Sequence, residues 1–182
     1  MINASIKGKE DPQYPIGKFK PPAEISQAER SAWINDLDAL PAELRDAITG
    51  LDHVQLETAY REDGWTLRQV VHHLPDSHLN SYARFRLALT EENPPIHAYR
   101  EADWAELSDA KTAPVELSLR LLQSLHERWV ILLRSMTDAQ FGRTFQHSQL
   151  GQVKLDWALG LYAWHGRHHV AQIASLRRRL GW

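Results

Sequence analysis

The most informative absence in this chain is cysteine, which does not occur among its 182 residues. Without cysteine the chain can form neither a disulfide bridge nor a thiolate metal site, and it has no cysteine nucleophile for covalent catalysis. Any transition-metal site must therefore be built from histidine, aspartate and glutamate side chains.

Long apolar runs and an excess of one charge are also missing. No segment approaches 18 consecutive apolar residues, which argues against a membrane-spanning helix. The chain starts without the apolar stretch of a secretory signal, MINASIKGKEDPQYPIGKF. The formal net charge is −2, from 21 Lys and Arg against 23 Asp and Glu, so no polyanionic partner is expected. The sequence predicts a cytoplasmic protein that binds neither membranes nor nucleic acids.

Hydrophobic periodicity predicts four long helices. Apolar residues recur at helical spacing in four segments, at 26–50, 66–89, 114–136 and 155–180. Ser26 and Glu29 form the S-x-x-E pattern of a capping box, and Gly181 is a typical helix stop. Pro41 and Pro75 each remove one backbone hydrogen bond inside a helix, so a kink is expected at each of them.

The remaining segments predict only small elements. Residues 143–155 contain two short runs around a turn and predict a hairpin, and a short helix is expected around Trp104. Four prolines among residues 1–24 predict an extended arm on the surface. We find no linker or internal repeat, so residues 1–182 are expected to form one domain. The fold class predicted is all-α, an antiparallel four-helix bundle with an extended N-terminal arm and one small hairpin.

Histidine is the residue type whose positions suggest chemistry. The chain has ten histidines, and the last predicted helix contains WHGRHH, Trp164–His169. His165 and His169 are four residues apart, which places both imidazoles on one face of a helix, about 5–6 Å apart at Cβ. That face is otherwise mostly apolar and should point into the bundle. Such a pair can converge on one metal ion.

A metal site in a bundle needs at least a third ligand, and spacing alone leaves its identity open. The second predicted helix offers His72, His73 and His78. Ligands on facing helices are a known way to build a metal site in a bundle core. Three neutral imidazoles suit Zn²⁺, Ni²⁺, Fe²⁺ or Cu²⁺ better than Mg²⁺ or Ca²⁺. Taken singly, His72, His78 and His168 are more typical of surface or hydrogen-bonded core histidines than of ligands.

Two longer segments resemble a known family. They are Gly64–Glu91, GWTLRQVVHHLPDSHLNSYARFRLALTE, and Leu159–Ile173, LGLYAWHGRHHVAQI. Both resemble the YfiT group, proteins provisionally assigned as metal-dependent hydrolases within the DinB-like superfamily. The segment Tyr14–Pro22 and the loop around Trp104 also fit, so the resemblance covers nearly the whole chain.

The resemblance implies more than the spacing does. It implies a DinB-like four-helix bundle and a metal bound by His73, His165 and His169, and it favours His73 over His72. It also implies a cytoplasmic homodimer. Zinc is the first metal expected and nickel the second.

Three hypotheses of function follow. The first is a metal-dependent hydrolase acting on a small molecule, in which three histidines leave a coordination position for water. The second, suggested by the resemblance, is a metal-dependent thiol S-transferase whose thiol comes from a cosubstrate. The third is a non-catalytic metal-binding stress protein. No catalytic residue is identified; Asp76 and His78 are the candidates for a general base, and Asp76 could instead orient a ligand or face solvent.

Overall fold

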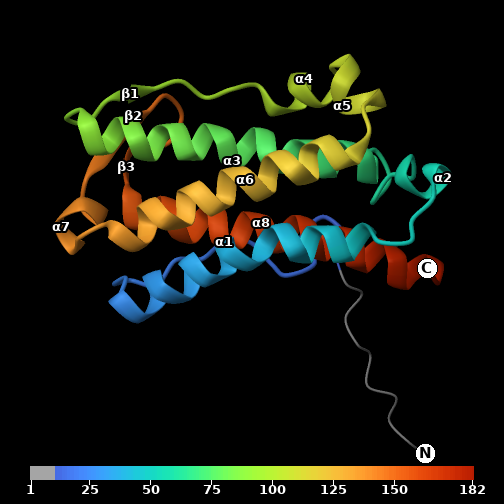
Figure 1. Ribbon diagram of the computed structural model, residues 1–182, viewed down its shortest axis with the longest axis horizontal. Helices are drawn as coiled ribbons and strands as arrows, with labels where there is room; N and C mark the ends of the chain where they lie inside the picture. The colour runs from blue at the N-terminus through green and yellow to red at the C-terminus, as the bar shows by residue number, and fades with distance from the viewer. Residues whose placement is uncertain (1–10) are drawn as a thin grey trace, which may run out of the picture.

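The computed structural model describes residues 11–182 and consists mainly of four long helices (Figure 1). They are α1 (Gln27–Ile48), α3 (Leu67–Thr90), α6 (Val115–Ser135) and α8 (Leu155–Leu180). These bounds lie within two residues of the predicted ranges, a difference that is usual at helix ends. The predicted four-helix bundle is confirmed.

Local signals in the sequence account for the helix ends. The side chain of Ser26 caps α1 in a complete capping box with Glu29, as predicted. Thr66 and Gln69 form an equivalent box at the start of α3, and α8 ends at Gly181 in the left-handed conformation, with φ 74°. Both α1 and α3 continue as helices through their internal prolines.

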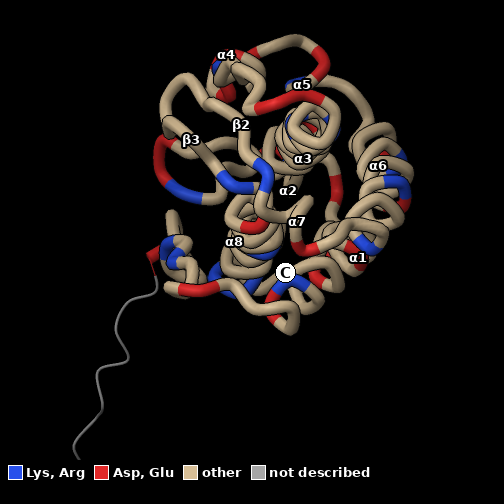
Figure 2. Tube along the Cα trace, turned by 90° about the vertical axis from the view of Figure 1, so that its left-hand side faces the viewer, with Lys and Arg blue, Asp and Glu red and all other residues tan. Residues whose placement is uncertain are grey.

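The order of the helices around the bundle differs from their order in the chain. Helices α1 and α3 each pack against both α6 and α8. Figure 1 shows α1 and α8 running in one direction and α3 and α6 in the other. The neighbours α3 and α6 are therefore parallel, because the chain between them returns along the whole bundle. Seen end-on, this returning segment covers the outer side of α3 (Figure 2).

The smaller elements lie in the connections. The predicted hairpin is present, with β2 (Thr144–His147) antiparallel to β3 (Gly151–Lys154). A third strand, β1 (Pro95–Ile96), pairs in parallel with β2 and was not predicted. The short helix expected around Trp104 is α4 (Glu101–Ala105). Three further short helices were not predicted: α2 (His53–Leu56), α5 (Ser108–Thr112) and α7 (Asp138–Phe141).

The N-terminal arm is partly described. Residues 11–24 contain no helix or strand and form two tight turns, while residues 1–10 of the predicted arm lie outside the described residues. The indole of Trp164 donates a hydrogen bond to the carbonyl oxygen of Gly17 at 3.1 Å, and the ring of Phe19 packs edge-on against Trp157. The described part of the arm therefore lies on α8. Within residues 11–182, no helix is long and apolar enough to cross a membrane.

The interior of the bundle is divided along its length. One cluster of buried apolar side chains includes Leu37, Phe85 and Trp129, and a second includes Leu74 and Ile173. Between them lie buried polar residues from three helices: His73, Ser77, His78, Ser81, His126, His168, His169 and Gln172. Burying this many polar groups is costly unless each finds a partner. The middle layer of the bundle therefore contains the candidate functional residues.

Candidate metal centre

Three histidines from two helices converge in this middle layer. The Nε2 atom of His165 on α8 lies 3.2 Å from Nε2 of His73 on α3 and 3.2 Å from Nε2 of His169 on α8. Within the described part of the chain, these residues are the group whose ligand atoms, all within 4.8 Å of one another, could hold a metal ion. Two nitrogens bound about 2.0–2.1 Å from a tetrahedral zinc ion lie about 3.3 Å apart. The two spacings to Nε2 of His165 fit such an ion, and the ligand atoms of His73 and His169 lie within 4.8 Å of each other.

All three imidazoles are held in the neutral form. Burial, with a further contribution from the nearby His168, lowers the pKa of His73 to about 4. Burial also lowers the pKa values of His165 and His169 well below the usual value, with neighbouring histidines adding to the shift. A neutral imidazole has one nitrogen with a free lone pair, which is what a metal ion requires.

The metal-free protein is expected to lose stability as the pH falls from about 6.5 to about 4. An unfolded histidine takes up a proton near pH 6.5, whereas burial lowers the pKa of His126, as of His73, to about 4. Acid therefore favours the unfolded state, by about 1 kcal/mol per pH unit for each such histidine. Protonation of Asp76 has the opposite effect, because its pKa in the folded protein is raised to about 6, so acid favours the folded state at this residue. The several buried histidines outweigh this single carboxyl group.

Urea unfolding in the presence of a chelator, at intervals between pH 7 and pH 4, measures this loss. The His126→Gln variant should show a shallower dependence on pH. A free energy of unfolding that stayed level or rose on acidification would contradict the account.

The side chain of Gln172 determines which nitrogen of His169 is free. Nε2 of Gln172 donates to the carbonyl oxygen of Gln13 at 3.1 Å, so its Oε1 faces Nδ1 of His169 at 2.8 Å. That oxygen only accepts hydrogen bonds, so the proton of His169 is on Nδ1. The Nε2 lone pair of His169 is therefore directed at the centre of the three histidines, an arrangement common behind metal ligands.

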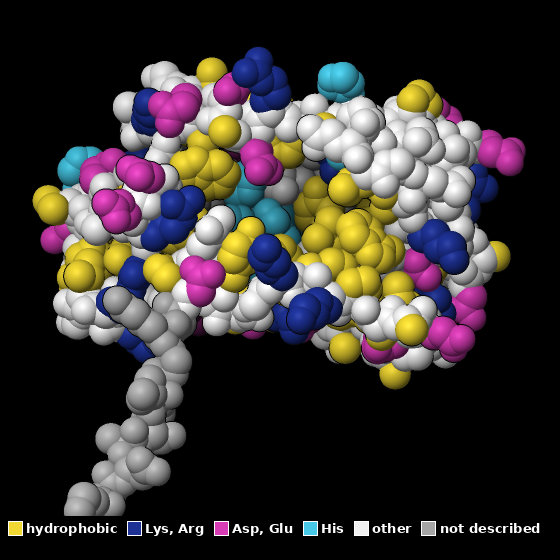
Figure 3. All heavy atoms as spheres, turned by 180° about the vertical axis from the view of Figure 1, so that it is seen from behind, with side chains coloured by type: hydrophobic (Ala, Val, Ile, Leu, Met, Phe, Trp, Pro, Cys, Tyr) yellow, Lys and Arg dark blue, Asp and Glu magenta, His cyan; other side chains and the backbone are white. Residues whose placement is uncertain are grey.

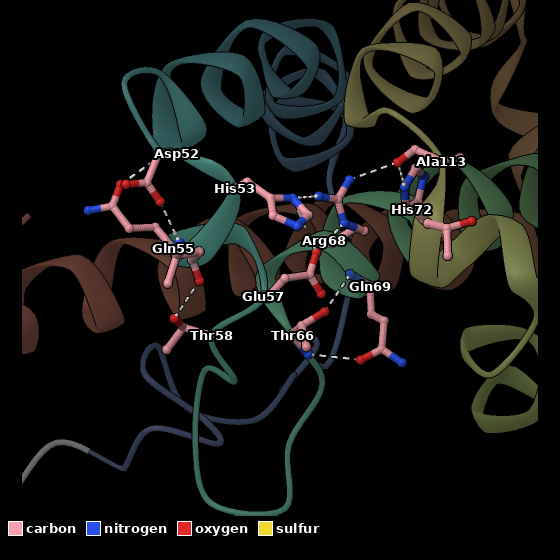
Figure 4. A network of polar contacts seen from close by, with 12 residues as sticks. Asp52, His53, Gln55, Glu57, Thr58, Thr66, Arg68, Gln69, His72 and Ala113 are labelled. Atoms are coloured by element: carbon pink, nitrogen blue, oxygen red, sulfur yellow. Dashed lines mark hydrogen bonds and ion pairs between the residues drawn. The ribbon is translucent and has the colours of Figure 1, made fainter.

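The other histidines considered as ligands lie elsewhere. Nε2 of His72 is 3.1 Å from the carbonyl oxygen of Ala113 (Figure 4). Its Nδ1 is 2.7 Å from the hydroxyl of Ser118, so both ring nitrogens contact groups outside the centre. His78 contacts His165 at Nδ1, on the opposite side of the ring from the shared Nε2. His168 stacks on Trp164. The structure thus brings His73, and not its neighbours, to the pair on α8.

A polar cavity opens onto the three histidines. It has a volume of about 370 Å³, and its wall includes Trp65, Arg61 and Glu101. Figure 3 shows histidine side chains at the bottom of a hollow, with hydrophobic side chains on either side and an acidic side chain beside it. A smaller cavity of about 180 Å³ is also lined by His165 and Glu101. Glu101 therefore lines both spaces beside His165.

Neither residue suggested as a general base lines these cavities. Asp76 is half-buried, and its pKa is raised to about 6 by burial and by the charge of Asp109. His78 is fully buried behind His165. Both cavities are instead lined by Glu101, which comes from a short helix in the returning segment.

Sequence reasoning missed three residues of this region. Gln172 had a signal, because it follows His169 by three residues on the same helix. His126 also had one, as a polar residue on the apolar face of α6 beside Leu122 and Leu125. Glu101 had none, because the long connection between α3 and α6 brings it to the site.

The fold and the geometry together define a class of protein: a four-helix bundle with a candidate three-histidine metal centre at the floor of a cavity. Comparison with known proteins identifies the superfamily of this bundle. The family model described as the DinB superfamily matches residues 11–173, and the chain belongs to this superfamily. The resemblance found in the two histidine segments is confirmed.

Several relatives are similar over almost their whole length. Proteins from Bacillus cereus strain 03BB102 and Bacillus thuringiensis subsp. konkukian are each 55% identical over 172 residues, covering 94% of this chain and 99% of theirs. Both are named metal-dependent hydrolases, an assignment that their names mark as provisional.

Two solved structures resemble the fold. YfiT from Bacillus subtilis, described as a probable metal-dependent hydrolase with an unusual four-helix bundle topology, has a TM-score of 0.91 and 52% identity, covering 94% of this chain and 98% of that one. The four-helix bundle protein TT2238 has a TM-score of 0.54 and 20% identity over 78% of this chain and 94% of its own. The second likeness supports the fold alone.

Proposed function

We propose that this protein is a metal-dependent hydrolase whose metal ion is bound by His73, His165 and His169. The observation that carries the proposal is the convergence of three neutral imidazole nitrogens at the floor of a cavity. The names of the relatives point in the same direction. Three protein ligands leave a coordination position open, which is typical of catalytic rather than structural zinc sites.

The donor set favours particular metals. Three imidazoles without a thiolate suit zinc, nickel, iron or copper, and hard cations such as Mg²⁺ and Ca²⁺ prefer oxygen ligands. The spacing of 3.2 Å from Nε2 of His165 to the Nε2 atoms of His73 and His169 is that of two nitrogens on one tetrahedral ion. We propose zinc as the metal, with nickel as the second candidate.

The cavity supports a small-molecule substrate. Its volume of about 370 Å³ lies at the lower end of the range for ligand pockets. The ring of Trp65 packs 4.7 Å from that of His73 and gives the site an apolar wall. A divalent ion bound here would supply Lewis acidity and activate a water molecule. Glu101 is our candidate for accepting the proton, because it is an acidic residue that lines both of the cavities that His165 lines.

A substrate screen tests the proposal. The zinc-loaded protein is expected to hydrolyse at least one compound in a panel of esters, amides and phosphate esters, while the His169→Ala variant does not. Glu101→Gln should retain zinc and lose about 100-fold or more in kcat, the usual contribution of a general base.

The same screen separates the alternatives. Consumption of an electrophile only when a small thiol is added would replace hydrolysis with thiol transfer. Zinc-saturated protein that is inactive under every condition would favour the non-catalytic binding protein.

Three properties stay predictions. They are the organisation of residues 1–182 as a single domain, the cytoplasmic location and the homodimeric assembly, of which the last rests on the resemblance alone.

A further inference from the structure

A chain of buried histidine rings runs from the candidate metal centre across the bundle. Nδ1 of His165 on α8 lies 3.2 Å from Nε2 of His78 on α3. Nδ1 of His78 lies 2.9 Å from Nε2 of His126 on α6, and Nδ1 of His126 lies 2.5 Å from the backbone carbonyl oxygen of Leu37 on α1. Each of the four long helices thus contributes one member. His78 is 0% exposed and His126 is 1% exposed, so water does not interrupt the chain.

The last acceptor is available because of a proline. In an α-helix the carbonyl oxygen of Leu37 would accept the N–H of the residue four positions later, and that residue is Pro41, which has no N–H. A buried carbonyl without a donor costs free energy, and Leu37 is 1% exposed. The ring of His126 supplies the missing donor. The proline that the sequence marked as a possible kink thus frees the acceptor that ends the chain.

The carbonyl determines the direction of every hydrogen bond in the chain. It can only accept, so His126 must donate from Nδ1, and the neutral ring then has a bare Nε2. That nitrogen accepts from Nδ1 of His78, whose Nε2 is bare in turn and accepts from Nδ1 of His165. The proton of His165 is therefore on Nδ1, and its Nε2 lone pair faces His73 and His169.

The reverse arrangement is unfavourable. With the protons on the other nitrogens, the bare Nδ1 of His126 would face the oxygen of Leu37 at 2.5 Å, placing two acceptors in contact without a hydrogen between them. A charged ring would have to be buried among apolar residues such as Trp129, whose ring packs against both His78 and His126.

We propose that His78 and His126 are positioning residues that hold His165 in the tautomer able to bind a metal through Nε2. The inference rests on the proposed metal site but not on the reaction catalysed there. It extends to His165 the arrangement that Gln172 provides for His169, in which a backbone carbonyl determines the tautomer of a ligand through an intermediate side chain. Such groups behind a ligand typically contribute about 10–100-fold to metal affinity.

The tautomer can be measured directly in the unmodified, metal-free protein. Long-range ¹H–¹⁵N correlation spectra of ¹⁵N-histidine-labelled protein should show His165, His78 and His126 each protonated on Nδ1, with Nε2 unprotonated. A proton on Nε2 of His165 would overturn the proposal. This measurement does not depend on any variant folding or on any activity.

Variants then test the effect on metal binding, with zinc alone as the probe. His126→Leu removes the acceptor for His78, which lets the tautomers of His78 and His165 reverse; Kd for zinc should rise about 10–100-fold. His126→Gln has an amide that can donate to Leu37 and accept from His78, so it should restore both the affinity and the Nδ1 tautomer. His72→Leu is the matched control, because it removes a similarly buried histidine from α3 outside the chain, and its Kd should be unchanged.

Two results would overturn the proposal at this stage. One is an unchanged Kd in folded His126→Leu. The other is an equal loss of affinity in His72→Leu, which would mean that any buried histidine affects the site through stability. Failure of the proposed hydrolase function would look different, because the tautomer and the affinity would stand while the substrate screen stayed negative.

Discussion

Replacing His165 with alanine is expected to weaken zinc binding by about 100- to 1000-fold. Structural zinc sites bind with about 10–16 kcal/mol shared among four ligands, so one ligand contributes about 2.5–4 kcal/mol. His165 is also the central member, because its Nε2 lies 3.2 Å from that of both His73 and His169. The two ligands that remain in His165→Ala rarely hold a catalytic metal. Metal content after dialysis, followed by a competition titration, measures the loss.

His168→Ala is the matched control for this experiment. His168 is a buried histidine on the same helix, next to His169, but its ring stacks on Trp164 and its Nε2 lies 3.0 Å from the amide nitrogen of Gln172. Its removal should leave the metal content near one ion per chain. Full occupancy in His165→Ala would remove this residue from the site.

His73→Ala is expected to release the metal while His72→Ala retains it. These neighbours on α3 are similarly buried, at 5% and 6% exposure, and differ mainly in direction, since adjacent residues lie about 100° apart around a helix. His73 faces His165, and His72 faces Ser118 and Ala113. Metal content and urea unfolding, measured on both variants, separate a ligand from a structural residue.

The loss of folding stability should follow the opposite order and be larger in His72→Ala than in His73→Ala. His72→Ala leaves the buried hydroxyl of Ser118 without its partner, while the carbonyl oxygen of Ala113 keeps its hydrogen bond from Arg68, and should lower the free energy of unfolding by about 1–3 kcal/mol. In the metal-free state, His73→Ala removes a buried ring that lies among other histidines. It should therefore lower the free energy of unfolding by a smaller amount. Metal loss in His72→Ala with retention in His73→Ala would mean that the ring directions on α3 are reversed.

Local patterns in the sequence predicted the helices well, because periodicity and caps act within a few residues. The pair His165 and His169 could be predicted for the same reason, since a helix alone places them on one face. The choice between His72 and His73 could not, because spacing does not tell which side of α3 faces α8. The resemblance to a family favoured His73, and the direction of its ring in the bundle agrees.

Features that depend on packing between distant segments were not predictable. The parallel arrangement of α3 and α6 follows from a connection that crosses the whole bundle, and β1 exists only because that connection passes β2. Glu101 reaches the cavity through the same segment. The contact between His126 and the carbonyl of Leu37 joins residues 89 positions apart. Pro41 was noticed as a helix breaker, but its effect on that carbonyl required the fold.

The three-histidine metal centre is tested most directly by anomalous diffraction from crystals of the zinc-loaded protein. One anomalous peak per chain is expected, about 2.0–2.1 Å from Nε2 of His73, His165 and His169, with a fourth position open to the cavity. A strong peak at any other set of side chains, or fully loaded protein with no peak between these three rings, would contradict it.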